Sequence, residues 1–132
     1  MVPKLSSEVA RAYGEFPLKV RRKLMNLRKV IFHAADNLEV GPLTETLKWG
    51  EPAYLTESTK SGSTIRLGWK KTNPEYVCVY FNCKTTIVGE TRSNFGDLFE
   101  YEKDRAVLLN VTADVPDEIN WCIEAALIYH RR

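Results

Sequence analysis

The strongest constraint on this chain is a run of apolar residues at helical spacing between Pro17 and the Gly41-Pro42 pair. At about 100° per residue, one set of side chains falls within an arc of about 100°. That set comprises Val20, Leu24, Leu27, Ile31, Ala34, Ala35 and Leu38. Pro17 suits a first helical turn, where a missing N–H breaks no hydrogen bond. The pattern predicts a helix over about 17–38 with one stripe facing a core.

The middle of the chain has the patterns of β-strands. Ile65, Leu67 and Trp69 alternate with polar or small residues, which is typical of a half-buried strand. We therefore expect Trp69 to lie buried under the long helix. Residues 76–82 are rich in β-branched and aromatic side chains, which favours a central strand. The short polar turn between the two segments indicates antiparallel pairing.

The remaining elements complete a mixed pattern. We expect helices over about 6–13, 43–50, 85–97 and 116–129, a strand that begins at Ala53, and a hairpin over 98–111. The strands follow one another as hairpins, and no linker or repeat interrupts the chain. This order predicts one compact α+β domain over residues 1–132, with an antiparallel sheet of about five strands and helices packed mainly on one face.

Charge and composition narrow the class of protein. Lys plus Arg number 19 and Asp plus Glu 17, for a net charge of +2, which disfavours a nucleic-acid partner. Apolar runs are far shorter than the ~20 residues of a membrane helix, and residues 1–16 do not resemble a signal peptide. We therefore expect a cytoplasmic protein without a membrane partner. Three cysteines fit reduced thiols, and His33 and His130 lie too far apart to suggest a metal site.

Two segments carry a family resemblance. The run LKWGEPAY over residues 47–54, followed by IRLGW over 65–69, resembles the YdhG-like family of small bacterial domains, largely catalogued as a domain of unknown function. The resemblance covers most of the chain, and the Trp-Gly-x-Pro-x-Tyr element is its most specific part. It implies a compact α+β domain with an antiparallel sheet. One branch of the family is described as frataxin-like and iron-handling, but this chain lacks the dense acidic surface expected of an iron carrier.

The Trp49-Gly50-Glu51-Pro52 element is the first candidate site. In one interpretation it is structural: Gly50 ends a helix, Pro52 sets the next strand and Trp49 fills the core. In the other, Trp49 and Tyr54 line a pocket at the helix–strand corner with Glu51 at its mouth, since aromatic walls with a few polar groups are usual in ligand pockets. Both interpretations remain open from the sequence.

The polar face of the predicted strand pair is the second candidate site. Arg66 and Lys70 alternate with Gly68, and a glycine within a strand can mark the close approach of a ligand. On the neighbouring strand, Tyr80 shares one face with Tyr76, Cys78 and Asn82. Together these side chains predict a basic, aromatic floor for an anion, with an ordinary solvated sheet face as the alternative.

Charged runs and one helix face add weaker hypotheses. The bases of residues 17–30, Arg28 included, are expected on a solvated helix face, although they could contact phosphates. The acids of residues 97–104 could gather a hard cation, but solvation of a hairpin tip is favoured.

Trp121 and Ile128 lie opposite the core stripe of the last helix. The N-terminal segment is the expected cover, with a second subunit as the alternative, so monomer and homodimer both stay open.

No catalytic motif is present: there is no Gly-x-Ser-x-Gly, P-loop or His-Glu-x-x-His, and no catalytic residue or cofactor can be named. The sequence favours a non-enzymatic small-ligand-binding or interaction module whose partner is an unknown small molecule or protein. Its candidate ligand-binding residues are Trp49, Glu51, Tyr54, Arg66, Lys70 and Tyr80. A frataxin-like iron-handling protein and an enzyme of unrecognised type are the alternatives.

Overall fold

A computed structural model describes residues 2–131, which form a six-stranded antiparallel sheet and four α-helices. The helices are α1 (Ser7–Gly14), α2 (Leu18–Leu38), α3 (Ile87–Phe95) and α4 (Ile119–Leu127). The strands are β1 (Thr44–Lys48), β2 (Glu51–Leu55), β3 (Ile65–Trp69), β4 (Tyr76–Phe81), β5 (Glu100–Glu102) and β6 (Ala106–Asn110). Their order across the sheet is β1-β2-β3-β4-β6-β5. The α+β class is confirmed, with six strands in place of about five.

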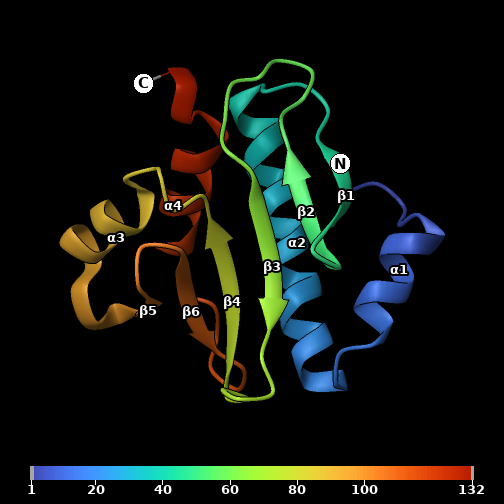
Figure 1. The fold of residues 1–132 in the computed structure, drawn as a ribbon. Helices are drawn as coiled ribbons and strands as arrows, with labels where there is room; N and C mark the ends of the chain where they lie inside the picture. The colour runs from blue at the N-terminus through green and yellow to red at the C-terminus, as the bar shows by residue number, and fades with distance from the viewer. Residues whose placement is uncertain (1, 132) are drawn as a thin grey trace.

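The helices gather on one side of the sheet. Figure 1 shows α2 and α4 behind the strands, α1 beside the β1–β2 edge and α3 beside the other edge. The apolar stripe of α2 meets the inward side chains of β3 and β4, and this contact forms the core. Among the residues that the structure describes, no helix crosses the opposite face of β2, β3 and β4. Within residues 2–131, no helix is both long enough and apolar enough to cross a bilayer.

The helix expected over residues 43–50 is instead strand β1. It pairs with β2 so that Lys48 lies opposite Glu51, and only Trp49 and Gly50 form the turn between them. Both turn residues have positive φ, 56° and 76°, as in the type I′ turns that suit two-residue hairpins. Pairing along the whole of β2 satisfies more backbone groups than an isolated helix of two turns. This hairpin supplies the sixth strand.

Two expectations about the core are also corrected. Trp121 packs edge-on against Phe95 of α3, with ring centroids 5.8 Å apart, whereas α1 lies against α2, β1 and β2. The cover over Trp121 is therefore intrachain, but it is α3 rather than the N-terminal segment. Trp69 is only half-buried, because β3 ends there and its indole lies at the rim of the core.

Candidate functional site

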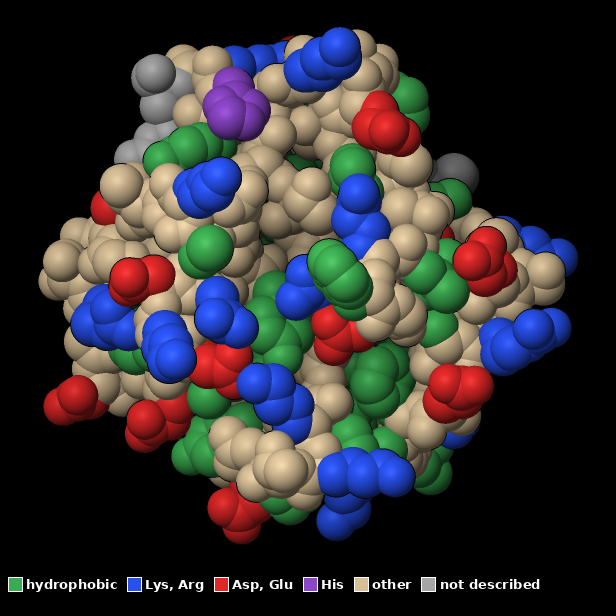
Figure 2. Space-filling view, in the orientation of Figure 1, with side chains coloured by type: hydrophobic (Ala, Val, Ile, Leu, Met, Phe, Trp, Pro, Cys, Tyr) green, Lys and Arg blue, Asp and Glu red, His purple; other side chains and the backbone are tan. Residues whose placement is uncertain are grey.

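The uncovered face of the sheet carries a band of charged and aromatic side chains. Since successive side chains in a strand alternate between faces, Arg66 and Gly68 point away from the core while Ile65 and Leu67 point into it. We call this outward surface of β2, β3, β4, β6 and β5 the open face. Figure 2 shows Lys and Arg side chains interleaved with Asp and Glu over these strands, with hydrophobic side chains between them.

An ion pair on an aromatic floor occupies the centre of the open face. Arg66 Nε donates a hydrogen bond to Glu51 Oε1 at 2.7 Å, and the guanidinium carbon lies 4.5 Å from the centroid of the Tyr80 ring. The Arg66 and Glu51 side chains are 28% and 25% exposed, whereas Tyr80 is 6% exposed. Tyr80 thus holds the guanidinium by a cation–π contact while part of the ion pair stays in water.

The ion pair depends on Gly68. A Cβ atom at Gly68 would lie 2.0 Å from Glu51 Oε2 and 3.0 Å from Tyr80 Cε2. No side chain fits there unless the Glu51 carboxylate moves. The space that the sequence pattern associates with a ligand is therefore filled by the chain's own Glu51.

Burial shifts the acid–base properties of the open face. It raises the pKa of Glu51 above the usual carboxyl range, although Arg66 and Lys70 oppose the shift. Burial likewise raises the pKa values of the Tyr80 hydroxyl and the Cys78 thiol. Cys78 is consequently a poor nucleophile near neutral pH, since the thiolate is the reactive form.

A second group of charges continues the band. Lys70 Nζ lies 2.5 Å from Glu102 Oε1, and the other Glu102 oxygen lies 3.9 Å from Arg105 Nε. Glu102 therefore neutralises Lys70 and leaves Arg105 only loosely paired. Arg105 is 53% exposed in its side chain and lies in the β5–β6 turn.

A hollow of about 390 Å³ opens beside the ion pair, and we call it the cationic groove. Its lining is Lys48, Thr64, Arg66, Tyr80, Phe81, Asn82, Cys83 and Arg105. Three of these residues are cations from distant parts of the chain, and none is a carboxylate. Arg66 bonds Glu51 through Nε, so its two Nη groups have no hydrogen-bond partner among residues 2–131. The groove is suited to a ligand that brings negative charge.

The structure unites some of the predicted site residues and separates others. Glu51, Arg66 and Tyr80 form one cluster, with Lys70 further along the open face. Trp49 is 90% exposed in the hairpin turn, and Tyr54 is fully buried on the core side. The pocket expected between Trp49 and Tyr54 is therefore wrong, as is a core position for Trp49.

Sequence reasoning missed Lys48 and Arg105 as members of the groove. Residues 44, 46 and 48 point toward the open face because β1 pairs with β2. A period-two interpretation of residues 43–48 would have placed Lys48 there. Arg105 carried no such signal, since only the pairing of β6 with β4 brings its turn next to Phe81, whose N–H donates to the Arg105 carbonyl.

A second Glu–Arg pair lies on the core side of the same hairpin. Arg28 is 3% exposed, and its guanidinium donates to both Glu45 carboxylate oxygens at 2.5 and 3.0 Å. Tyr54 also donates to Glu45 at 2.7 Å, and the Tyr13 hydroxyl lies 2.5 Å from that of Tyr54. The expected solvated position of Arg28 is wrong. Arg28 lies about 20° past the edge of the α2 stripe, close enough for Glu45 to draw it inward.

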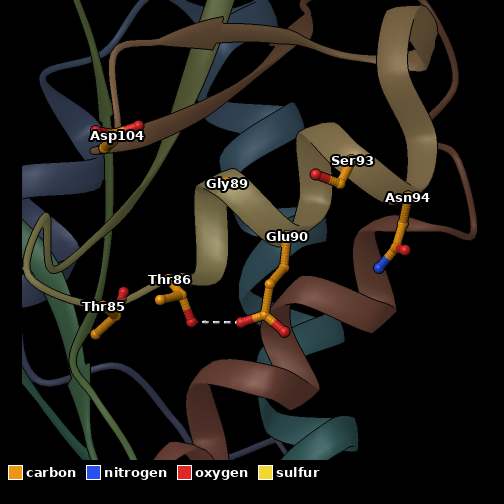
Figure 3. Close-up of a pocket in the computed structure, with 7 residues that line it drawn as sticks. All are labelled: Thr85, Thr86, Gly89, Glu90, Ser93, Asn94 and Asp104. Atoms are coloured by element: carbon orange, nitrogen blue, oxygen red, sulfur yellow. Dashed lines mark hydrogen bonds between the residues drawn. The ribbon is translucent and has the colours of Figure 1, made fainter.

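Other polar regions show weaker arrangements. Asp104 lies 3.6 Å from Arg92, and among residues 2–131 no three His, Cys, Asp or Glu side chains gather to hold a metal ion. A hollow of about 540 Å³ lies at the start of α3, where Thr86 Oγ1 donates to Glu90 at 2.5 Å. Figure 3 shows this hydrogen bond and the residues around the hollow. Its lining is small and polar: Thr85, Thr86, Gly89, Glu90, Ser93, Asn94 and Asp104. With two carboxylates and no cation, this hollow does not suit an anion.

Comparison with known proteins adds no assignment. No protein-family model, curated protein or solved structure matches this chain. The resemblance to the YdhG-like family stays a prediction from the sequence, and residues 47–54 and 65–69 carry its motifs.

Proposed function

We propose that this chain is a non-enzymatic binding domain whose cationic groove takes a small ligand bearing a phosphate or carboxylate group. The observation that carries the proposal is the lining of the groove, where Lys48, Arg66 and Arg105 converge without a carboxylate. Membership of the YdhG-like family of bacterial domains and a cytoplasmic location are part of the same proposal, on the sequence features alone.

Among the cations of the groove, the Arg66 side chain is the one preorganised to bind an anion. Glu51 and the Tyr80 ring hold its guanidinium in place, and its Nη groups remain available to donate. Two parallel N–H donors match the spacing of two oxygens on a carboxylate or phosphate. Because the guanidinium is already ordered, little side-chain entropy is lost on binding.

The chemistry of the groove favours binding over catalysis. Its lining includes the hydroxyl of Thr64 and the thiol of Cys83, but no histidine, aspartate or glutamate to act as a base beside them. Its positive charge also favours anions over iron cations, which weakens the iron-handling alternative. The lining of the groove thus supplies cations that can bind an anion, but no base that could activate a nucleophile.

Titration with simple anions tests the proposal. Inorganic phosphate, pyrophosphate and citrate are titrated at low salt, with thermal unfolding and calorimetry as readouts. A ligand that binds only the folded state at about 100 times its Kd adds about 2.7 kcal/mol of stability. We expect at least one anion to give a saturable rise in Tm.

A matched pair of double variants locates the binding. We expect Lys48→Gln with Arg105→Gln to weaken anion affinity about tenfold or more, since each cation contributes charge-assisted contacts. Arg11→Gln with Lys29→Gln removes the same charge from exposed helix positions and should leave affinity unchanged. Equal losses in both variants, or no saturable effect of any of the three anions, would refute the proposal.

A further inference from the structure

Another hollow lies where the turn between β3 and β4 meets the start of α2, and that turn is at the lower end of the molecule in Figure 1. Its volume is about 280 Å³, and we call it the apolar slot. The lining comprises Pro17, Lys19, Val20, Trp69, Pro74, Glu75, Asn110, Val111 and Thr112. It shares no residue with the cationic groove, so it is a separate feature.

The walls of the apolar slot are held in place by the fold. Trp69 Nε1 donates to the Pro74 carbonyl at 3.0 Å, so the polar atom of the indole is satisfied and its apolar surface can line the slot. Val111 N donates to the Glu75 carbonyl at 2.8 Å, which fixes the opposite wall. Val20, 3% exposed, belongs to the core beneath. The slot is therefore preformed.

A basic hollow of about 240 Å³ adjoins the apolar slot. It is lined by Lys19, Arg22, Lys23, Asn26 and Val111, so the two hollows share Lys19 and Val111. Among residues 2–131, Lys19 and Arg22 have no hydrogen-bond or ion-pair partner from their side chains, whereas Lys23 donates to the Ala113 carbonyl. Two unpaired cations thus stand at one end of an apolar cavity.

We propose that the apolar slot and the basic hollow together bind one small anionic amphiphile, an acyl or aryl carboxylate. The apolar body lies against Trp69, and the carboxylate lies between Lys19 and Arg22. Glu75 lines the slot but not the basic hollow, so its negative charge favours this orientation over the reverse. The slot has room for about nine water volumes of about 30 Å³, which suits a medium-length acyl chain or an aromatic ring.

The first test follows the indole N–H signals of the three tryptophans by ¹H–¹⁵N correlation spectroscopy. The probes are octanoate below its micelle concentration, octanol and acetate, and Trp69→Phe assigns the Trp69 signal. We expect octanoate to shift the Trp69 signal saturably. Octanol and acetate should each bind at least about tenfold more weakly, because octanol lacks the carboxylate and acetate lacks the apolar chain. Equal binding of octanol, or shifts confined to Trp49 and Trp121, would overturn the proposal.

Charge variants test the head-group end. Lys19→Gln with Arg22→Gln should weaken octanoate binding about fivefold or more and leave octanol binding unchanged. Arg11→Gln with Lys29→Gln is the control, since it removes the same charge elsewhere and should bind octanoate like the wild type. If both double variants bind octanoate equally, the carboxylate does not lie between Lys19 and Arg22.

A third variant probes the junction of the two hollows. Val111→Asp places a carboxylate at one of the two residues that both hollows share, and we expect octanoate affinity to fall about tenfold or more. Dispersed amide signals confirm that the variant folds, and wild-type octanoate affinity in a folded variant would refute the site. Binding to phosphatidylglycerol vesicles without binding to monomeric octanoate would assign the surface to a membrane instead and overturn the small-ligand proposal.

Discussion

Two glutamate–arginine pairs lie on opposite faces of the same hairpin. Glu45 of β1 pairs with Arg28 inside the core at 2.5 Å, and Glu51 of β2 pairs with Arg66 on the open face at 2.7 Å. The side chains of the core pair are 10% and 4% exposed, whereas those of the open-face pair are 25% and 28% exposed. The pairs are chemically alike, so their difference comes from what surrounds them.

The core pair makes further hydrogen bonds to other parts of the chain. Tyr54 donates to Glu45, and Arg28 also donates to the Pro3 carbonyl at 2.7 Å. In the open-face pair, neither Nη group of Arg66 has a hydrogen-bond partner among residues 2–131, and burial raises the pKa of Glu51. The same two residue types therefore build a structural cluster under a helix and a candidate binding site where no helix covers them.

Neutralising each glutamate in turn should give the largest contrast. We expect Glu45→Gln to lower the free energy of unfolding by about 3–5 kcal/mol, because it leaves the buried Arg28 charge uncompensated. Glu51→Gln should cost less than about 1 kcal/mol, since water solvates Arg66 when its partner is lost. Urea denaturation of both variants measures the two changes. Similar losses would show that burial does not distinguish the pairs.

Removing single hydroxyl groups should give a smaller contrast. Tyr13→Phe deletes one of two side-chain partners of the Tyr54 hydroxyl, and Glu45 is the other; we expect a loss of about 1–2 kcal/mol. Tyr80→Phe keeps the ring under Arg66 and should cost about 0.5 kcal/mol or less. Chemical denaturation compares the two variants. A larger loss for Tyr80→Phe would place the more important hydroxyl on the open face.

The smallest effect concerns pH. Folded Glu51 holds its proton to a higher pH than unfolded Glu51, because burial raises its pKa. In the pH window between the two pKa values the native state binds more protons, so the unfolding free energy falls as pH rises. We expect wild type to lose stability relative to Glu51→Gln as the pH rises from the ordinary carboxyl pKa through the raised pKa of folded Glu51. Denaturation curves across this range measure the difference, and a relative gain for wild type would mean that Arg66 outweighs burial.

Local patterns predicted the elements whose signals lie within one segment. The stripe of α2 is confirmed, and so are the strand β3 and its alternation from Ile65 to Leu67, because each depends on the spacing of side chains along a single helix or strand. Residues 43–50 carried no decisive local signal. Their strand conformation depends on pairing with β2 and on two consecutive residues with positive φ, Trp49 and Gly50.

The candidate site was predictable only in part, for the same reason. The alternation around Gly68 placed Arg66 on the outward face of β3, next to the space that a glycine leaves. The structure shows the outward Arg66 and the space at Gly68. That Glu51 fills the room depends on the pairing of β2 with β3, in which Ala53 lies opposite Arg66. Lys48 and Arg105 join Arg66 only when β1, β3 and the β5–β6 turn come together in space.

The sequence alone determined the α+β class, the long helix, the central strands and the face of β3 that carries Arg66. Only the tertiary structure decided that Arg28 is buried, that Trp49 is exposed and that Glu51 pairs with Arg66. The physical reason is the distance along the chain over which the deciding interactions act. Periodicity along the chain sets which side of an element is apolar, but whether a charged side chain is buried with a partner or left facing water depends on which distant element lies across from it.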